Sequence, residues 1–182
     1  MVACVDRRGE AGLVAVGCGR DAVADDEHRA TIAEVMRDTR IAILTYTDGE
    51  GRLVSTPMGT QDFEDPSTVW FITEADSDKV AAITADPRVN VAYSSDKGWV
   101  SLSGTATLNT DKAKLEELWD PSASMFMKGG PEDPNSALLE VTGDSAQLWE
   151  SPGSVGFLVA MAKSFLGKED PAKDEDAPIV EL

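Results

Sequence analysis

The sequence contains very little histidine and cysteine. Among its 182 residues only His28 is a histidine, and the only cysteines are Cys4 and Cys18. A catalytic triad or a proton relay that uses histidine would therefore have to be built around His28 alone. Because His28 precedes an amphipathic segment, we interpret it as a solvent-facing residue of a first helical turn. The cysteines have no second pair and no partner histidine nearby, so we expect two free thiols and no metal site.

Basic residues and long apolar runs are also scarce. The 16 lysines and arginines are outnumbered by 33 aspartates and glutamates, and the formal net charge is -17. Binding to nucleic acids or anionic membranes requires clustered basic residues, so neither is an expected partner. No apolar run reaches the roughly 20 residues that cross a bilayer, and the N-terminus lacks a secretory pattern. We therefore expect a cytoplasmic protein whose acidity serves solubility or adaptation to a salty cytoplasm.

The chain does contain enough apolar residues for one core. Its length and its hydrophobic content of 42% suit a single domain with frayed ends. We expect a poorly ordered N-terminal extension over residues 1–25, the folded domain over 26–167, and an acidic C-terminal tail over 168–182. Asp25 or Asp26 is expected to cap a helix that begins near Glu27.

Short β-rich segments separated by turn residues dominate the middle of the chain. The expected strands cover residues 41–47, 53–58, 68–73, 89–93, 99–108, 138–142 and 146–149. Pro57 cannot donate a ladder hydrogen bond, so its strand must lie at an edge, a bulge or a strand end, while Gly104 predicts a bulge. Helices are expected at few points, over residues 76–85, 110–119 and 154–166. This order predicts an α+β protein, mainly β, with about six or seven antiparallel strands in a closed or split barrel and flanking helices.

The last expected helix bears on assembly. Residues 154–166 are apolar nearly all round, which is unusual for a helix that faces solvent on one side. One of its surfaces would be exposed in a monomer and buried against a second copy. The sequence therefore predicts a homodimer.

The connection that follows the strand ending at Thr73 has features of a phosphate site. A helix N-terminus presents unpaired amide donors and the positive end of its dipole, and an anion can bind both. Thr73 and Ser77 add hydroxyl groups, and Lys79 adds a positive charge. The residues alone also allow a structural interpretation, in which Asp76 or Ser77 only caps the helix and Lys79 is solvated.

Several short motifs occur along residues 27–182 in an order that resembles a known family. They include Gly51-Arg52-Leu53-Val54-Ser55-Thr56-Pro57-Met58, Val69-Trp70-Phe71-Ile72-Thr73, Asp76-Ser77-Asp78-Lys79-Val80, Val100-Ser101-Leu102-Ser103-Gly104 and Gln147-Leu148-Trp149-Glu150. In this order and spacing the motifs resemble the general-stress-protein branch of the pyridoxamine-phosphate-oxidase-like split barrels, the flavin mononucleotide (FMN)-binding split-barrel type.

The resemblance implies a homodimer that binds FMN at the subunit interface. By position, it assigns Thr73, Ser77 and Lys79 to the phosphate, with Ile72 as a further cofactor contact. It assigns Ser55, Thr56, Pro57 and Met58 to the ring and ribityl chain, Trp99 and Ser101 to the neighbourhood of the ring, and Trp149 to an approach from the other subunit. These residue types suit a flavin, which needs an apolar or aromatic wall and a cationic phosphate cradle.

The sequence departs from the family pattern at three points. Many relatives carry an arginine where this chain has Thr56, and the oxidase itself carries a second one where this chain has Asp78, so we expect weaker phosphate binding. No arginine or histidine follows Trp149, so the classical oxidase reaction is not expected. The resemblance then implies a flavin-dependent oxidoreductase of an unknown small substrate. The alternatives are a non-catalytic flavin-binding or sensing protein, or the same fold holding a deazaflavin (F420) or haem.

Overall fold

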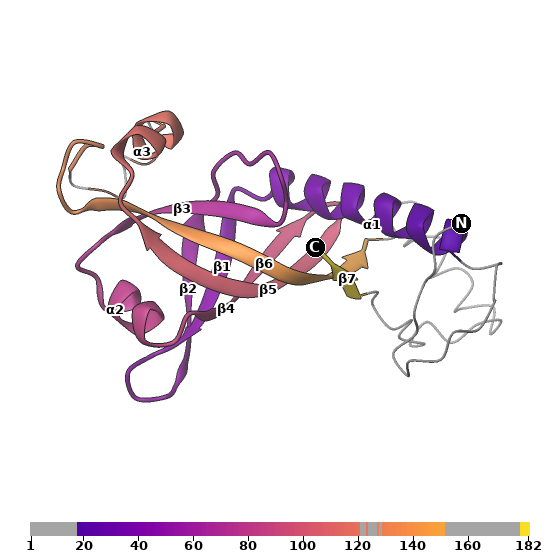
Figure 1. The fold of residues 1–182 in the computed structure, drawn as a ribbon, viewed down its shortest axis with the longest axis horizontal. Helices are drawn as coiled ribbons and strands as arrows, with labels where there is room; N and C mark the ends of the chain where they lie inside the picture. Colours follow the sequence, from indigo (N-terminus) through magenta and orange to yellow (C-terminus); the bar gives the residue numbers. More distant parts are fainter. Residues whose placement is uncertain (1–17, 121–122, 124–126, 128, 152–178) are drawn as a thin grey trace.

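One antiparallel sheet forms the body of the protein in a computed structural model, which describes residues 18–120, 123, 127, 129–151 and 179–182 (Figure 1). The elements are α1 (Cys18–Asp38), β1 (Ile41–Thr47), β2 (Leu53–Gly59), β3 (Thr68–Glu74), α2 (Asp78–Ala85), β4 (Arg88–Ser95), β5 (Gly98–Asn109), α3 (Lys112–Leu118), β6 (Ser136–Glu150) and β7 (Ile179–Glu181). The strand order is β2-β1-β4-β5-β6-β3, with β7 paired to β6. The helix expected over residues 154–166 lies outside the described residues.

The sheet curls into a split barrel. Strands β2 and β3 stand at opposite ends of the hydrogen-bonded order, yet they come into contact with each other. The barrel is therefore closed by packing rather than by a ladder at this point. This confirms the mainly β split barrel that the sequence predicts, and it leaves two unpaired strand edges facing each other across the split.

The β1–β2 hairpin fixes one side of the split. The backbone N–H groups of Glu50 and Arg52 each donate to the Asp48 carboxylate at 2.9 Å, and Gly51 takes a positive φ of 78° in the turn. The ladder then pairs Ile43 with Pro57 on the edge strand β2. The edge position predicted for Pro57 is thus confirmed.

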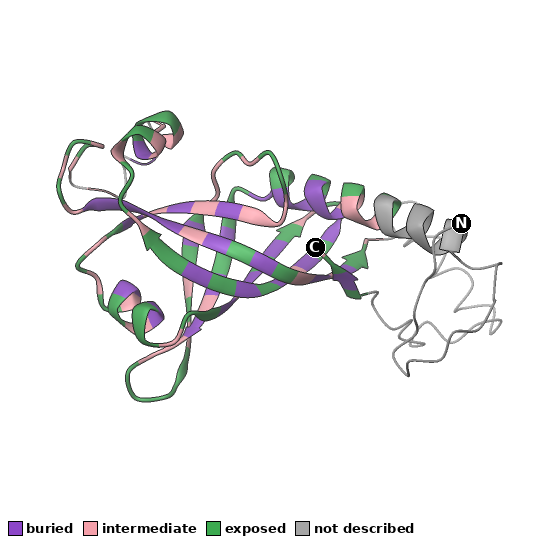
Figure 2. Ribbon diagram, in the orientation of Figure 1, coloured by how far each residue is buried: buried purple, intermediate pink, exposed green. Residues whose placement is uncertain are grey.

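Burial alternates along the strands, as the banding in Figure 2 shows. In β1 the side chains of Ala42, Leu44 and Tyr46 are buried, whereas the intervening Ile41 and Ile43 are exposed. Partners across an antiparallel ladder point to the same face. The inward face forms the core, and the opposite face of the sheet is open on β1, β2, β4 and β5.

Helix α1 covers one end of the barrel and packs against β4 and β5. Its residues Ile32, Val35 and Met36 are buried, as their helical spacing predicts. The expected start near Glu27 is wrong, because the helix begins at Cys18 and continues through Asp25 and Asp26. The segment after Gly19 contains no glycine or proline to stop it, and its alanines favour helix. No described helix combines the length and hydrophobicity needed to cross a bilayer.

The end of the chain differs from the sequence prediction. The two strands expected over 138–142 and 146–149 form one strand, β6, and the seventh strand is β7, within the tail expected over 168–182. Strand β3 pairs with residues 136–142 of β6, which leaves the same edge free further along, and β7 pairs there with residues 145–147. The Arg29 guanidinium donates to the Glu181 carbonyl, so α1 also holds β7.

A bulge is confirmed beside Gly104, although its extra residue, Asp144, belongs to the partner strand β6. The β5–β6 register shifts between Ser103 and Gly104, where Gly104 lies opposite Gly143. A Cβ atom on Gly104 would overlap the carbonyl oxygen of Thr142, which is backbone and cannot turn away. The Gly104→Ala variant should therefore lose roughly 1–3 kcal/mol of unfolding free energy. Urea denaturation checks this against Gly49→Ala, where nothing lies within 4 Å, and equal stability of the two variants would contradict the prediction.

Candidate functional site

A pocket of about 840 Å³ lies at the split, between the ends of β2 and β3 and beside the start of α2. Its lining residues are Arg40, Ile41, Pro57, Met58, Gly59, Thr60, Gln61, Ile72, Thr73, Glu74, Ser77, Lys79, Asp120, Ala123 and Met127. We call it the cation pocket, because it contains one lysine and one arginine. Six of the residues expected to contact a cofactor meet here: Pro57, Met58, Ile72, Thr73, Ser77 and Lys79.

Lys79 is the central cation of this pocket. It lies in the first turn of α2, and its Nζ is 3.2 Å from the Sδ atom of Met58. A thioether is a weak acceptor, and none of the ion pairs among the described residues includes Lys79. Burial lowers the pKa of Lys79, while the negative charge of Glu74 acts in the opposite direction. The ammonium is thus partly desolvated and lacks an anionic partner in the part of the chain that the structure describes, and an incoming anion would supply one.

The N-terminus of α2 adds polar groups to the same pocket. Ser77 is the N-cap, and its Oγ accepts from the Val80 N–H at 3.4 Å and donates to the Glu74 carbonyl at 2.8 Å. Of the two capping residues that the sequence allows, Ser77 and not Asp76 caps the helix, and the Asp76 carboxylate accepts instead from the side chain of Asn135 at 2.7 Å. The amides of Asp78 and Lys79 have no carbonyl partner within the helix. They remain available to a ligand.

Thr56 occupies a different environment from the rest of its segment. It pairs with Leu44 and therefore points to the inward face, as Met58 does. Its Oγ1 atom is buried and has no hydrogen-bond partner. A buried hydroxyl without a partner is costly, so this position is not optimised for the protein alone.

The remaining predicted residues lie on the open face of the sheet. They are neighbours across the ladders of the sheet, in the cross-strand pairs Ile43–Pro57, Thr45–Ser55, Ile43–Ala92, Ala92–Ser101 and Trp99–Trp149. We call the surface formed by Ile41, Ile43, Ser55, Pro57, Ala92, Trp99, Ser101 and Trp149 the outer face. Four of its large apolar side chains are 40–50% exposed: Ile41, Ile43, Trp99 and Trp149. Ile41 and Pro57 also line the cation pocket, so the pocket and the outer face are continuous.

Sequence reasoning missed Arg40, Gln61, Glu74 and Asp120, which also line the pocket. The hairpin register holds a clue to Arg40. Ile41 pairs with Gly59, so Arg40 and Thr60 must lie side by side where the two strands end. No such local clue exists for Asp120, which follows α3 and reaches the pocket only through the tertiary fold.

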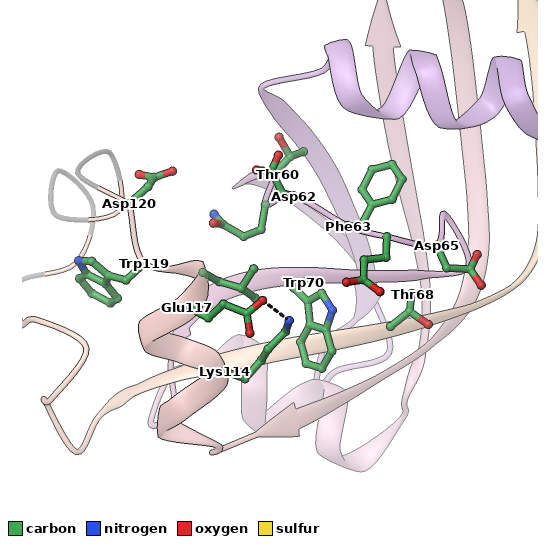
Figure 3. A pocket seen from close by; sticks show the side chains of 13 residues that line it. Thr60, Asp62, Phe63, Asp65, Thr68, Trp70, Lys114, Glu117, Trp119 and Asp120 are labelled. Atoms are coloured by element: carbon green, nitrogen blue, oxygen red, sulfur yellow. Dashed lines mark hydrogen bonds and ion pairs between the residues drawn. The ribbon is translucent and has the colours of Figure 1, made fainter.

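A second pocket of about 590 Å³ adjoins the first and shares Thr60, Gln61 and Asp120 with it. Figure 3 shows Trp70 between α3 and the segment that carries Phe63. The described residues that line this second pocket include one lysine, Lys114, and five acids: Asp62, Glu64, Asp65, Glu117 and Asp120. The protein's own cations already cover two of its rings, with Lys114 5.9 Å from the Trp70 centroid and Arg37 4.9 Å from that of Phe63. An anion would therefore favour the cation pocket.

Fold and site together define a split-barrel protein with a pocket at its open edge, where Arg40 and Lys79 lie together with two carboxylates. The sequence profile described as "Pyridoxamine 5'-phosphate oxidase like" matches residues 27–172. The chain belongs to this family.

Its relatives include general stress proteins. A structure assigned as general stress protein 26 from Jannaschia sp. CCS1 is 28% identical, covers 90% of this chain and 100% of that chain, and has a TM-score of 0.66. The general stress FMN/FAD binding protein of Xanthomonas citri is 28% identical, with 71% and 92% covered and a TM-score of 0.62. Protein bli-3 of Neurospora crassa is 25% identical over 128 residues, 64% of this chain but only 61% of that protein. The chain thus falls in the general-stress-protein branch.

Proposed function

We propose that this chain binds FMN, with the phosphate of the flavin in the cation pocket and its ring on the outer face. The observation that carries the proposal is the ammonium of Lys79, partly buried and without an anionic partner among the described residues. A phosphate monoester bears about -1.5 to -2 charges near pH 7 and would supply that partner. The family of the chain and the name of the Xanthomonas relative support the same ligand.

The residues present suit a flavin phosphate in part. Lys79 and the first-turn amides of α2 offer donors, and Thr73 is buried beside them in the pocket wall. The Ser77 hydroxyl already donates to Glu74, so it must rotate before it can donate to a phosphate. Beyond the pocket, the apolar outer face offers the wall that an isoalloxazine ring requires.

The flavin would bind between two copies of the chain. Ile41, Ile43, Trp99 and Trp149 form an exposed apolar surface that is continuous with the cation pocket. A second copy would cover this surface and exclude water from the ring. A homodimer is therefore part of the proposal, and the outer face is its interface.

We further propose that the protein is an oxidoreductase of a small substrate. The flavin, once bound, would accept and donate electrons, while the protein positions it and shields it. A second candidate is a non-catalytic flavin carrier or sensor. One observation favours it: among the described residues, the titratable ones that line the cation pocket are Arg40, Glu74, Lys79 and Asp120, and none is a histidine.

An absorbance spectrum of the freshly purified protein, before and after addition of FMN and gel filtration, tests flavin binding. We expect the visible flavin bands to remain with the protein. A colourless protein that also fails to quench the fluorescence of added FMN would remove the proposal. Oxidation of a reduced nicotinamide by the loaded protein, at a rate well above that of free FMN, separates the oxidoreductase from the carrier.

A further inference from the structure

Arg40 leaves the backbone at a fixed point beside the cation pocket. Its carbonyl accepts from the N–H and the Oγ1 of Thr60, both at 3.1 Å, which ties the start of β1 to the end of β2. The preceding Thr39 is buried, and its hydroxyl is 2.8 Å from the Val35 carbonyl and 3.1 Å from the Ser94 carbonyl. Arg40 itself is exposed and lines the pocket, so its guanidinium is attached to a backbone that is held in place beside the pocket.

The guanidinium of Arg40 has no acidic partner among the described residues, although acids outnumber bases two to one in this chain. Arg52 pairs with Asp48 at 2.7 Å and with Glu50 at 2.8 Å, and Arg88 pairs with Asp86 at 2.7 Å. No ion pair or side-chain hydrogen bond of this kind joins Arg40 to a described carboxylate. Its planar set of donors is therefore free to bind an external anion.

The charge of the pocket shows why a second cation matters. Two carboxylates, Glu74 and Asp120, line it together with two cations, Arg40 and Lys79. Among the described lining residues, Lys79 alone would be outnumbered by carboxylates. With Arg40 included, the described cations and carboxylates are equal in number, and the ligand meets one cation from the first turn of α2 and one from the residue that precedes β1.

We propose that Arg40 binds the ligand's phosphate together with Lys79 and sets the preference of the site for a phosphorylated flavin over riboflavin. This inference rests on the proposed function, since the anion in question is the phosphate of FMN. A guanidinium can hold two phosphate oxygens in a fixed planar geometry, whereas the ammonium of a lysine acts as a point charge, so Arg40 would orient the phosphate as well as neutralise it.

The test compares FMN with riboflavin, which lacks the phosphate, by fluorescence titration of the full chain at low salt. Arg40→Gln should weaken FMN binding about 10- to 100-fold, the usual effect of losing hydrogen bonds to a charged group, and leave riboflavin binding unchanged. Arg40→Lys should recover part of the loss. Arg37→Gln serves as the control, because Arg37 is also exposed but contacts Phe63 outside the cation pocket.

Two results would overturn the inference. One is FMN binding by Arg40→Gln within twofold of the parent. The other is an equal loss of FMN and riboflavin, which would assign Arg40 to the fold instead of the phosphate. Failure of the parent chain to bind either flavin is a different outcome, because it would remove the proposed function itself.

Discussion

Replacement of Lys79 by methionine will abolish most FMN binding and leave the fold intact. Methionine keeps the length of the aliphatic stem and removes only the charge, so the pocket wall does not collapse. Loss of one partner from a desolvated charge pair costs about 2–5 kcal/mol, or roughly 30-fold to several thousand-fold in affinity. Fluorescence titration with FMN measures the loss.

The matched control is Lys114→Met on α3. Lys114 is paired with Glu117 at 2.8 Å and lies in the adjoining acidic pocket, so its loss should change FMN affinity little. Unfolding of both variants in urea should show that Lys79→Met is no less stable than the parent without ligand, because it removes a partly buried charge that has no partner. Parent-like FMN affinity of Lys79→Met would show that the phosphate binds elsewhere.

The same lysine gives the site a dependence on pH. The anion binds the protonated amine, and burial places the pKa of Lys79 below the ordinary value of 10.5. FMN affinity of the parent should therefore fall as pH rises through that lowered pKa, whereas Lys79→Met should show no such fall there. Below about pH 6 both proteins should bind FMN more weakly, because the phosphate takes up its second proton.

Local residue chemistry was enough to predict most of the barrel. The turn after Asp48, the edge position of Pro57 and the bulge at Gly104 each follow from what one residue can or cannot do with its backbone. Strand β7 could not be predicted from single residues in this way. Ile179 and Val180 lie in an acidic tail, and they become a strand only because an edge of β6 is free beside them. Pairing of this kind depends on the assembled sheet.

The candidate site, too, could be predicted from the sequence only in part. Ser77 and Lys79 are two residues apart in the sequence, so a strand-to-helix connection already predicts that they share a site. The pocket as a whole exists because β2 and β3 meet across the split, which brings the end of one hairpin to the start of α2. Arg40 lines the pocket only because the strand ends come together in the folded barrel, and no motif around residue 40 indicates a role in binding.

Replacement of Trp149 by lysine should convert the proposed homodimer into a monomer and remove the proposed FMN binding with it. Trp149 pairs with Trp99 across the β5–β6 ladder, and the two are 42% and 50% exposed in the single chain. Large aromatic anchors at the centre of an interface typically contribute about 2–4 kcal/mol, and a lysine there would also bury an unpaired charge. Light scattering coupled to size-exclusion chromatography measures the change in mass.

The control for this variant is Leu108→Lys, at an apolar residue of β5 that is 37% exposed but opposite the buried Leu139, away from the outer face. It should remain dimeric and bind FMN as the parent does. Because the flavin is proposed to lie between the subunits, loss of the dimer and loss of FMN binding should occur together in Trp149→Lys. A monomeric variant with parent-like FMN affinity would show that the flavin ring does not bind at the interface. A variant that stays dimeric would show that the outer face does not join two copies.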